Sequence, residues 1–233
     1  MTQFISHIHR ELRNARRTRR GSTMKEPPRG IHKTYARMEK IVLPKPESLD
    51  MRLTDALRKR TSYSGGNPDT DISLPVLSTL LGQAIGKRVG THKRSYPSGS
   101  GLYPIETYLI AHIDSTEHYV FHYNPTDHSL EKLWKLGENI KLKQLVPVPD
   151  DLLFSALFVF TSVWHRSSAK YGDFTYTLAL LEAGHISQNL LLTGTALQLR
   201  SRPMAGFNDD KIAEILDLDA EYEQPVHTIV FST

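Results

Sequence analysis

Residues 97–101, here called the anchor loop, could bring backbone groups close to a bound ligand. Their order is Pro97, Ser98, Gly99, Ser100 and Gly101. Neither a helix nor a central strand tolerates this composition well, whereas residues 105–110 alternate and include β-branched and aromatic side chains typical of a strand. A turn with so few side chains lets amides and a small hydroxyl approach something flat or anionic. A tight loop that merely needs glycine explains the same residues as well.

Three polar side chains alternate in a second segment, at the expected end of a helix. Arg60, Ser62 and Ser64 are spaced two residues apart, so an extended backbone directs all three to the same side. A guanidinium and two hydroxyls converging from one side suit a phosphate group. A solvated helix end accounts for these residues equally well, and both interpretations stay open on this segment alone.

The composition limits the class of protein. With 233 residues, 39% hydrophobic and 23% charged, the chain suits one substantial soluble domain. No apolar run approaches the roughly 18 residues of a membrane span, and no signal-peptide segment is recognised, so we expect a cytoplasmic protein. The lack of cysteine excludes disulfides and thiolate chemistry. The eleven histidines form no His-Glu-x-x-His motif and lack a carboxylate pattern, so we interpret them as mostly surface or structural and predict no metal site.

Positive charge is concentrated in the first 50 residues, which hold 12 lysines and arginines against 5 acidic residues. Phe4, Ile8 and Leu12 recur at helical spacing and predict an amphipathic helix over residues 2–20. The prolines of residues 21–46 predict an extended connector, so we divide the chain into a basic arm and connector (1–46) and a main domain (47–233). The arm could bind an acidic partner, but no aromatic residues interleave its arginines, which argues against nucleic acid.

The main domain is predicted to belong to the α+β class, because its helices and antiparallel strands segregate without repeated βαβ units. We expect Leu53, Ala56 and Leu57 to face inward from the first of these helices. The longest helix, predicted over residues 175–199, has apolar residues on more than one face, so we expect it to be central or at an interface. The predicted order is helix 48–59, helix 73–86, strands 105–113, 118–123, 130–134 and 152–163, helix 175–199, loop 200–207, helix 209–216 and strand 226–231.

Several motifs occur together in a family-specific order. They are Arg60-Thr61-Ser62, the string from Pro97 to Glu106, Lys170-Tyr171, Glu182-Ala183-Gly184-His185 with Gln188-Asn189, and Pro203-Met204-Ala205-Gly206-Phe207. In these motifs the chain resembles the SagB-type dehydrogenases, which are azoline oxidases of the nitroreductase superfamily. The resemblance covers nearly the whole chain. It implies an FMN-binding fold with an antiparallel-rich central sheet flanked by helices, and an obligate dimer with FMN and the long helix at the interface.

The resemblance also implies roles for individual residues. Arg60 and Ser62 would hold the FMN phosphate, the anchor loop would line the flavin ring from the other subunit, and backbone amides near residue 205 would face the reactive nitrogen. The superfamily's second arginine is Ser64 here, and Arg58, Arg94 or Arg202 could replace it. The predicted cofactor residues are Arg58, Arg60, Ser62, Ser64, Pro97, Ser98, Gly99, Gly101, Met204, Ala205 and Gly206.

Lys170 and Tyr171 match the pair that the family uses to oxidise azolines. Oxidation of a thiazoline or oxazoline removes a proton and a hydride. The hydride would go to FMN, and a lysine partly desolvated and close to Arg166 is expected to have a pKa low enough to accept the proton. The implied substrate is a ribosomally made precursor peptide, and the implied partner is a cyclodehydratase. Two alternatives remain: an NAD(P)H-dependent nitro- or quinone reductase, and a flavin-bearing scaffold subunit with little activity of its own.

Overall fold

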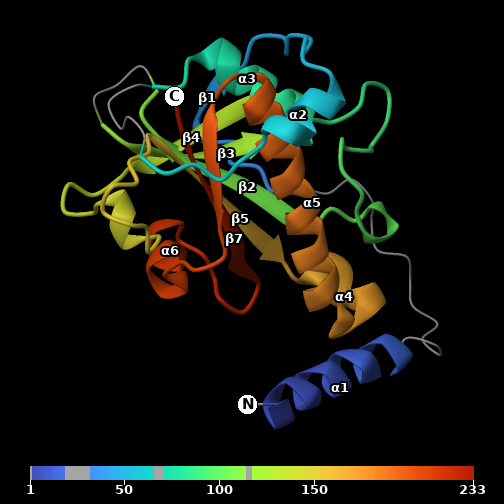
Figure 1. Cartoon of the computed structure of the whole chain (residues 1–233). Helices are drawn as coiled ribbons and strands as arrows, with labels where there is room; N and C mark the ends of the chain where they lie inside the picture. Colours follow the sequence, from blue (N-terminus) through green and yellow to red (C-terminus); the bar gives the residue numbers. More distant parts are fainter. Residues whose placement is uncertain (1, 19–31, 66–70, 114–116) are drawn as a thin grey trace.

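The computed structural model describes residues 2–18, 32–65, 71–113 and 117–233 of the chain. Its centre is a seven-stranded sheet in the order β1-β4-β3-β2-β5-β7-β6, in which every pair of neighbours is antiparallel. Figure 1 shows the sheet flanked by helices, which confirms the predicted fold class. The strands are β1 (Glu39–Val42), β2 (Ile105–Ala111), β3 (Tyr119–Asn124), β4 (Ser129–Lys135), β5 (Ala156–Val163), β6 (Arg200–Met204) and β7 (Glu223–Ser232).

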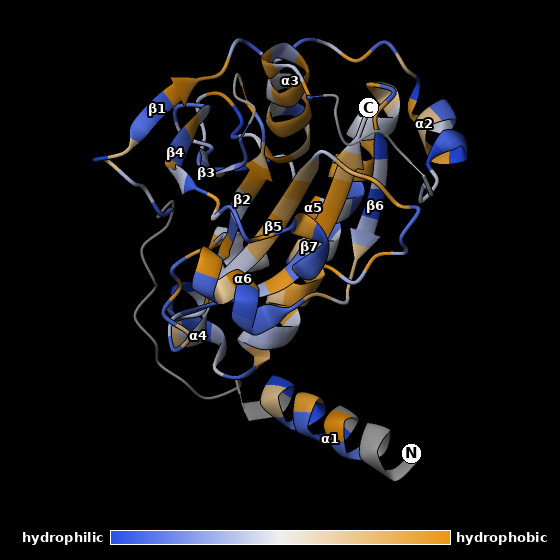
Figure 2. Ribbon diagram, turned by 90° about the vertical axis from the view of Figure 1, so that its left-hand side faces the viewer, coloured by the Kyte–Doolittle hydropathy of each residue, from blue (hydrophilic) through white to orange (hydrophobic). Residues whose placement is uncertain are grey.

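Helices and loops cover both faces of the sheet. The helices are α1 (Thr2–Thr18), α2 (Leu53–Lys59), α3 (Leu74–Ile85), α4 (His165–Tyr171), α5 (Phe174–Ala196) and α6 (Asp209–Ile215). Along β2, Ile105 and Leu109 join the core beneath α3 and α5, whereas Tyr108 and Ile110 join a second core that includes α6. β2 and β5 are buried on both faces and are accordingly mostly apolar, with Glu106 as the one charged residue within them. Figure 2 shows this apolar colouring on β5, α3 and α5.

α5 follows the prediction closely and dominates one face of the molecule. It has 23 residues and, among them, buried apolar positions such as Ile186 and Leu190, yet Tyr176, Leu180 and Leu181 are exposed. Apolar residues therefore surround much of this helix, as in a central or interface helix. Across the described residues, no helix combines the length and apolar character that crossing a membrane requires.

In three segments the structure has a helix or strand that we did not predict. Residues 200–207, expected as a loop, contain the edge strand β6, which tolerates Pro203 because an edge strand has one side without ladder bonds. Residues 165–171, to which we assigned no helix, form α4. Inside the predicted connector, the β-branched residues Ile41 and Val42 form β1, which pairs with β4.

The first helix of the main domain is shorter than predicted and faces outward. The amide of Glu47 donates to Thr79 Oγ1 and its carbonyl accepts from Gln83 Nε2, at 3.1 and 2.7 Å, which ties the preceding segment to α3. α2 therefore begins only at Leu53. The inward orientation of its leucines was wrong: Leu53 and Leu57 are 66% and 53% exposed, and only Ala56 is buried.

Candidate functional site

The segment that contains Arg60, Ser62 and Ser64 lies beside β6. Ser62 forms a parallel bridge with Ser201, and the amide of Tyr63 donates to the Ser201 carbonyl at 3.3 Å. Tyr63 is buried and its hydroxyl donates to the Leu153 carbonyl, whereas both serines are exposed. The backbone is thus extended as predicted, with Tyr63 turned inward and the two serines available on the surface.

Arginines from two segments meet at this position. Arg202 donates to the Tyr63 carbonyl at 3.2 Å. Burial raises the pKa of Tyr63, while the charges of Arg200 and Arg202 act in the opposite direction. Among the described residues, Arg60, Arg200 and Arg202 have no carboxylate partner. This arginine cluster (Arg60, Arg200 and Arg202) can hold a phosphate.

Three arginines were candidates to replace the superfamily's second arginine, where this chain has Ser64, and the structure places them differently. Arg202 lies in the arginine cluster, and Arg58 is exposed in the last turn of the neighbouring α2. Arg94 belongs elsewhere: it donates to the Tyr96 hydroxyl at 2.9 Å and stacks over the Tyr103 ring at 5.0 Å, next to the anchor loop. Arg200 is a further candidate that we missed, because β6 was taken for a loop.

β6 leads directly to exposed backbone amides. Met204 is half-buried against the second core, and its carbonyl accepts from Thr228 Oγ1 at 3.1 Å. Ala205 and Gly206 follow and are exposed. In the described part of the chain no hydrogen bond uses either amide as a donor. Two amides without an acceptor, on the segment that continues from Arg200 and Arg202, suit an anionic or acceptor-rich ligand.

The anchor loop packs against α4 and α5. Ser98 Oγ accepts from the Tyr103 amide at 2.9 Å, and the loop backbone takes positive φ at Ser100 and Gly101. A Cβ at Gly99 would come within 3.3 Å of Leu178 and 3.6 Å of Tyr171. A side chain at position 99 would require Leu178 to shift slightly, so glycine suits the close packing here, and the tight-turn interpretation and the ligand-loop interpretation are compatible.

Tyr171 joins the anchor loop, whereas Lys170 stays more open. The Tyr171 hydroxyl bonds to Ser100 Oγ at 2.5 Å, and the tyrosine is buried at the end of α4. Lys170 is half-buried in the last turn of the same helix. Arg166, which we expected to act on Lys170, turns inward instead, donates to the Tyr103 carbonyl at 3.1 Å and ion-pairs with Glu106. Its charge is therefore compensated.

The predicted site residues form two groups at opposite ends of α5. Lys170 and Tyr171 precede the helix, and the arginine cluster borders the strand that follows it. A helix of 23 residues is roughly 35 Å long. Figure 1 shows α4 at one end of α5 and α2 at the other. A single subunit therefore does not bring Lys170 and Arg60 together.

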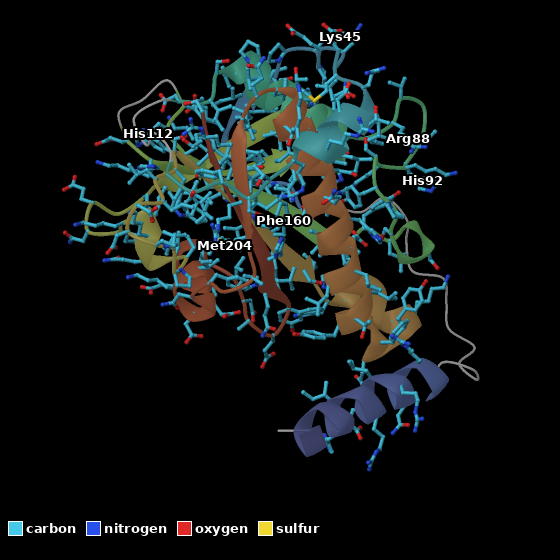
Figure 3. The ribbon with its side chains drawn as sticks, viewed as in Figure 1. Lys45, Arg88, His92, His112, Phe160 and Met204 are labelled. Carbon is cyan, nitrogen blue, oxygen red and sulfur yellow. The ribbon has the colours of Figure 1, made fainter. Side chains whose placement is uncertain are left out.

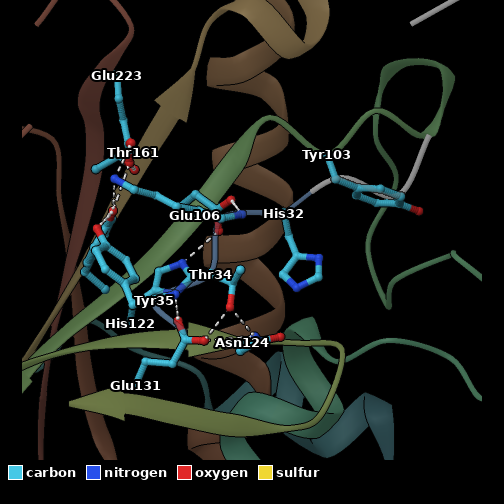
Figure 4. A network of polar contacts seen from close by, with 12 residues as sticks. His32, Thr34, Tyr35, Tyr103, Glu106, His122, Asn124, Glu131, Thr161 and Glu223 are labelled. Carbon is cyan, nitrogen blue, oxygen red and sulfur yellow. Dashed lines mark hydrogen bonds and ion pairs between the residues drawn. The ribbon is translucent and has the colours of Figure 1, made fainter. Parts of the chain in front are cut away.

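A buried ionic network fixes the strand that follows the anchor loop (Figure 4). His122 is enclosed between two carboxylates, with Nε2 2.9 Å from Glu106 and Nδ1 2.8 Å from Glu131. Burial lowers the pKa of His122, but the two carboxylates outweigh it and raise the pKa above its ordinary value. For Glu106, burial raises the pKa, yet His122, Arg166 and Arg94 hold it well below its usual range. The arrangement therefore favours the charged forms of His122 and of both carboxylates.

The same network holds residues 33–35 against the sheet. The Lys33 amide donates to Glu106 at 2.7 Å, and the Tyr35 amide donates to Glu131 at 3.0 Å. Lys33 Nζ reaches the buried Glu223 at 2.8 Å. We interpreted the histidines as mostly surface or structural; His122 is structural, and its two carboxylate partners are contacts that we did not predict. The signal was available: the turn after Asn124 places His122 directly opposite Glu131 in the β3–β4 pair.

Glu182 is a second buried carboxyl close to the anchor loop. It lies on α5, and its Oε1 has no hydrogen-bond partner among the described residues. Burial raises the pKa of Glu182 to about 7, although Ser98, Arg94, the Ile105 backbone and Arg166 all act to lower it. A carboxyl with such a pKa exchanges its proton near neutral pH.

Glu182→Gln is expected to flatten the pH dependence of stability. Because the folded-state pKa of Glu182 lies above the unfolded value, its contribution is present at low pH and is lost as pH rises towards 7. Between pH 5 and pH 8, the free energy of unfolding of the wild type should therefore fall by roughly 2–3 kcal/mol relative to that of the glutamine variant. Urea unfolding at fixed protein concentration measures this, with exposed Glu214→Gln as control. Parallel pH profiles of wild type and Glu182→Gln would contradict the assignment.

Comparisons with known proteins identify the family to which the chain belongs. A model of the nitroreductase family matches residues 57–231. The Escherichia coli microcin B17-processing protein McbC is 30% identical over 163 residues, which cover 66% of this chain and 60% of McbC. The putative nitroreductase MJ1384 of Methanocaldococcus jannaschii is 27% identical over 180 residues, which cover 74% of this chain and 88% of that protein.

Solved structures show the same fold. The E. coli microcin synthetase McbBCD complex with truncated pro-MccB17 bound matches with a TM-score of 0.68 and 25% identity, covering 75% of this chain and 69% of that one. A putative nitroreductase from Exiguobacterium sibiricum in complex with FMN matches with a TM-score of 0.54 and 13% identity, covering 80% of this chain and 90% of that one. With a family model matched over three quarters of its length, the chain belongs to the nitroreductase family, in which it resembles McbC.

Proposed function

We propose that this nitroreductase-family oxidoreductase is an FMN-dependent dehydrogenase that oxidises azoline rings in a ribosomally made peptide. The observation that carries the proposal is the packing of Tyr171, and with it the Lys170-Tyr171 pair, against the anchor loop through Gly99 and Ser100. The resemblance to McbC, a microcin-processing protein, supports a peptide substrate and a complex with a cyclodehydratase.

The residues fit FMN. The arginine cluster and the exposed serines, Ser62 and Ser64, suit its phosphate, and the free amides of Ala205 and Gly206 suit the acceptor atoms of the ring. When bound, FMN supplies a two-electron acceptor for the hydride that leaves the azoline. The chain's own part is to bind the peptide, orient its ring and take up the proton from the neighbouring carbon.

Lys170 is the proposed proton acceptor. It is half-buried, and it has a carbon-rich stem that can reach outward from the last turn of α4. Tyr171 is held by Ser100, so its hydroxyl is fixed relative to the anchor loop and can orient the ring or relay the proton. With FMN bound as the hydride acceptor, Lys170 would take up the proton from the neighbouring ring carbon, and Tyr171 would hold the ring in place for that transfer.

The site is completed by a second copy of the chain. The two predicted groups lie at opposite ends of α5, so antiparallel packing of two α5 helices would bring each catalytic pair to the partner's arginine cluster. Exposed apolar residues on α5 (Leu180, Leu181) and α2 (Leu53, Leu57) provide the surface for such a contact. We expect a homodimer at micromolar concentration in light scattering. Leu181→Glu should dissociate it and release the cofactor, whereas a flavin-loaded monomer would contradict this arrangement.

Arg60→Ala is expected to remove most of the bound flavin. A charge-assisted contact to a phosphate contributes roughly 1.5–3 kcal/mol, which corresponds to about a 10- to 100-fold weaker affinity. The measurement is the visible absorbance of the purified protein and the FMN released on denaturation. Arg52→Ala, an exposed arginine paired with Asp55, is the control. A colourless wild type that takes up no added FMN would refute the flavoenzyme proposal altogether.

A nitro- or quinone reductase is the second candidate. It is favoured by the similarity to MJ1384, a putative nitroreductase, over 88% of that protein. For this activity the flavin exchanges hydride with a nicotinamide and an acceptor, and the Lys170-Tyr171 pair has no necessary part. Assaying NAD(P)H oxidation and azoline oxidation in parallel, with the same Lys170 variants, separates the two functions.

A further inference from the structure

Residues 86–95, here called the basic hairpin, project between α3 and the anchor loop. The Ser95 amide donates to the Gly86 carbonyl at 3.1 Å and the Arg88 amide donates to the Lys93 carbonyl at 2.8 Å. Gly90, with a φ of +72°, closes the turn, and Val89 at the tip is fully exposed. The segment is therefore a defined hairpin that presents its side chains to solvent.

The exposed basic side chains of the hairpin have no ion-pair partner among the described residues, whereas the inward-pointing Arg94 lies close enough to the buried Glu106 and Glu182 to lower their pKa values. Lys87, Arg88, Lys93 and Arg94 are all basic, and residues 86–95 contain no acidic residue. In the described part of the chain none of these four has an ion-pair partner, although exposed lysines elsewhere, such as Lys135, do. Like charges held together in this way repel each other, and a bound anion would relieve the repulsion.

The base of the hairpin is tied to the candidate site. Arg94 points inward to Tyr96 and Tyr103, and its amide donates to the Tyr103 hydroxyl at 3.1 Å. Tyr103 in turn donates its amide to Ser98 of the anchor loop. The base of the hairpin is therefore joined through Tyr103 to the anchor loop, which packs against Tyr171.

Two adjoining cavities flank the hairpin and share Arg88 and His92. One, of about 490 Å³, lies between the hairpin and the anchor loop and reaches Ser98 and Ser100. The other, of about 800 Å³, extends along the opposite side to Lys45. Neither is lined by an aspartate or glutamate. Figure 3 shows Lys45, Arg88 and His92 along one side of the molecule.

We propose that the basic hairpin and its two cavities bind an acidic segment of the peptide substrate and guide its ring-bearing part to the anchor loop. This inference rests on the proposed function for the peptide nature of the ligand. Guanidinium and ammonium groups recognise carboxylates, and a cationic surface without acidic residues raises the association rate of an acidic chain. A nucleic acid fits less well, because the tyrosines that line the cavities (Tyr96, Tyr103, Tyr123) are buried and offer no ring for base stacking.

The test is a charge reversal in the full-length protein. A fluorescein-labelled peptide of alternating glutamate and glycine serves as the probe, and its anisotropy reports binding. We expect R88E/K93E to weaken binding about tenfold or more at low salt, and the wild-type affinity to fall as salt rises. K141E/K143E, which makes the same change in net charge at exposed lysines outside both cavities, should bind like the wild type.

Four results would overturn the inference: unchanged binding by R88E/K93E, an equal loss in K141E/K143E, equally tight binding of a serine–glycine peptide, or tighter binding of an oligouridylate than of the acidic peptide. The experiment needs no catalysis, so it stands apart from the proposed function. If the R88E/K93E variant still oxidises a short azoline peptide that lacks acidic residues, the variant is folded, and its weaker binding of the acidic peptide is due to the lost charges of the hairpin. If no azoline is oxidised by the wild type, the proposed function fails while the binding result remains.

Discussion

Glu106→Ala is expected to cost the protein about 3–5 kcal/mol of stability, the usual result of removing one partner of a buried ion pair. The side chain is buried, and its carboxylate is shared by His122, Arg166 and the Lys33 amide. Alanine would leave the Arg166 guanidinium without its counter-charge and the imidazolium with only one carboxylate. Since whole domains are stable by only about 5–15 kcal/mol, this is a large fraction of the total.

Urea unfolding followed by circular dichroism measures this effect. Glu106→Gln keeps the shape and one acceptor but loses the charge, so we expect an intermediate loss; it carries the test if the alanine variant yields no soluble protein. Arg52→Ala, which breaks an exposed ion pair, should change stability little. If Glu106→Gln and Glu106→Ala are both as stable as the wild type, the network is not what fixes β2 and α4 relative to each other.

The strength of this network also sets a pH limit. Like the pKa of Glu106, the pKa of Glu131 lies below its ordinary value. Burial raises the pKa of Glu131, but hydrogen bonds from His122, Asn124 and Thr34 outweigh burial and lower it to about 2. Both carboxylates therefore contribute stability above the unfolded-state pKa and lose it as pH falls through the folded-state value. The raised pKa of His122 acts in the other direction, so its contribution is lost as pH rises. The network is complete between these limits, near neutral pH.

Local pattern predicted most of the elements. The buried strand, the helix from Leu74 with Pro75 in its first turn, and the long α5 all follow from apolar periodicity and from turn residues close by in sequence. β6 was missed because Pro203 and the two arginines resemble a loop, and only its pairing with β7 shows that it is an edge strand. A short edge strand has too little local signal to outweigh its proline.

The site was predictable to the extent that it is local. The extended backbone at Arg60–Ser64 and the glycine-dependent turn at Gly99 could be read from residue types. The assignment of FMN and of Lys170 came from the resemblance, not from spacing. Contacts set by strand register, such as His122 with Glu106, and contacts between distant segments, such as Ser100 with Tyr171, depend on the folded chain. The ion pair between Arg166 and Glu106 could not be predicted from the sequence either, because the two residues lie 60 positions apart.

Lys170→Ala is expected to leave the fold and the bound FMN intact and to slow azoline oxidation by about 10²–10⁴-fold, the usual contribution of a positioned proton acceptor. Lys170 has no part in the ionic network or in the proposed cofactor contacts, so a purely structural loss is not expected. The assay follows an azoline-containing peptide by mass spectrometry, because each oxidised ring loses two hydrogens. Lys143→Ala, an exposed lysine remote in sequence, is the matched control.

Tyr171→Phe tests the second half of the pair. It removes only the hydroxyl that bonds to Ser100, and the ring can still pack against Gly99, so we expect a smaller loss than for Lys170→Ala. A loss as large as that of Lys170→Ala, with flavin retained, would move the proton-accepting role to the tyrosine. The decisive outcome concerns the lysine: a Lys170→Ala enzyme that stays yellow and oxidises the peptide at the wild-type rate would refute its role. Because hydride exchange at a flavin needs no protein base, that result would favour the general reductase.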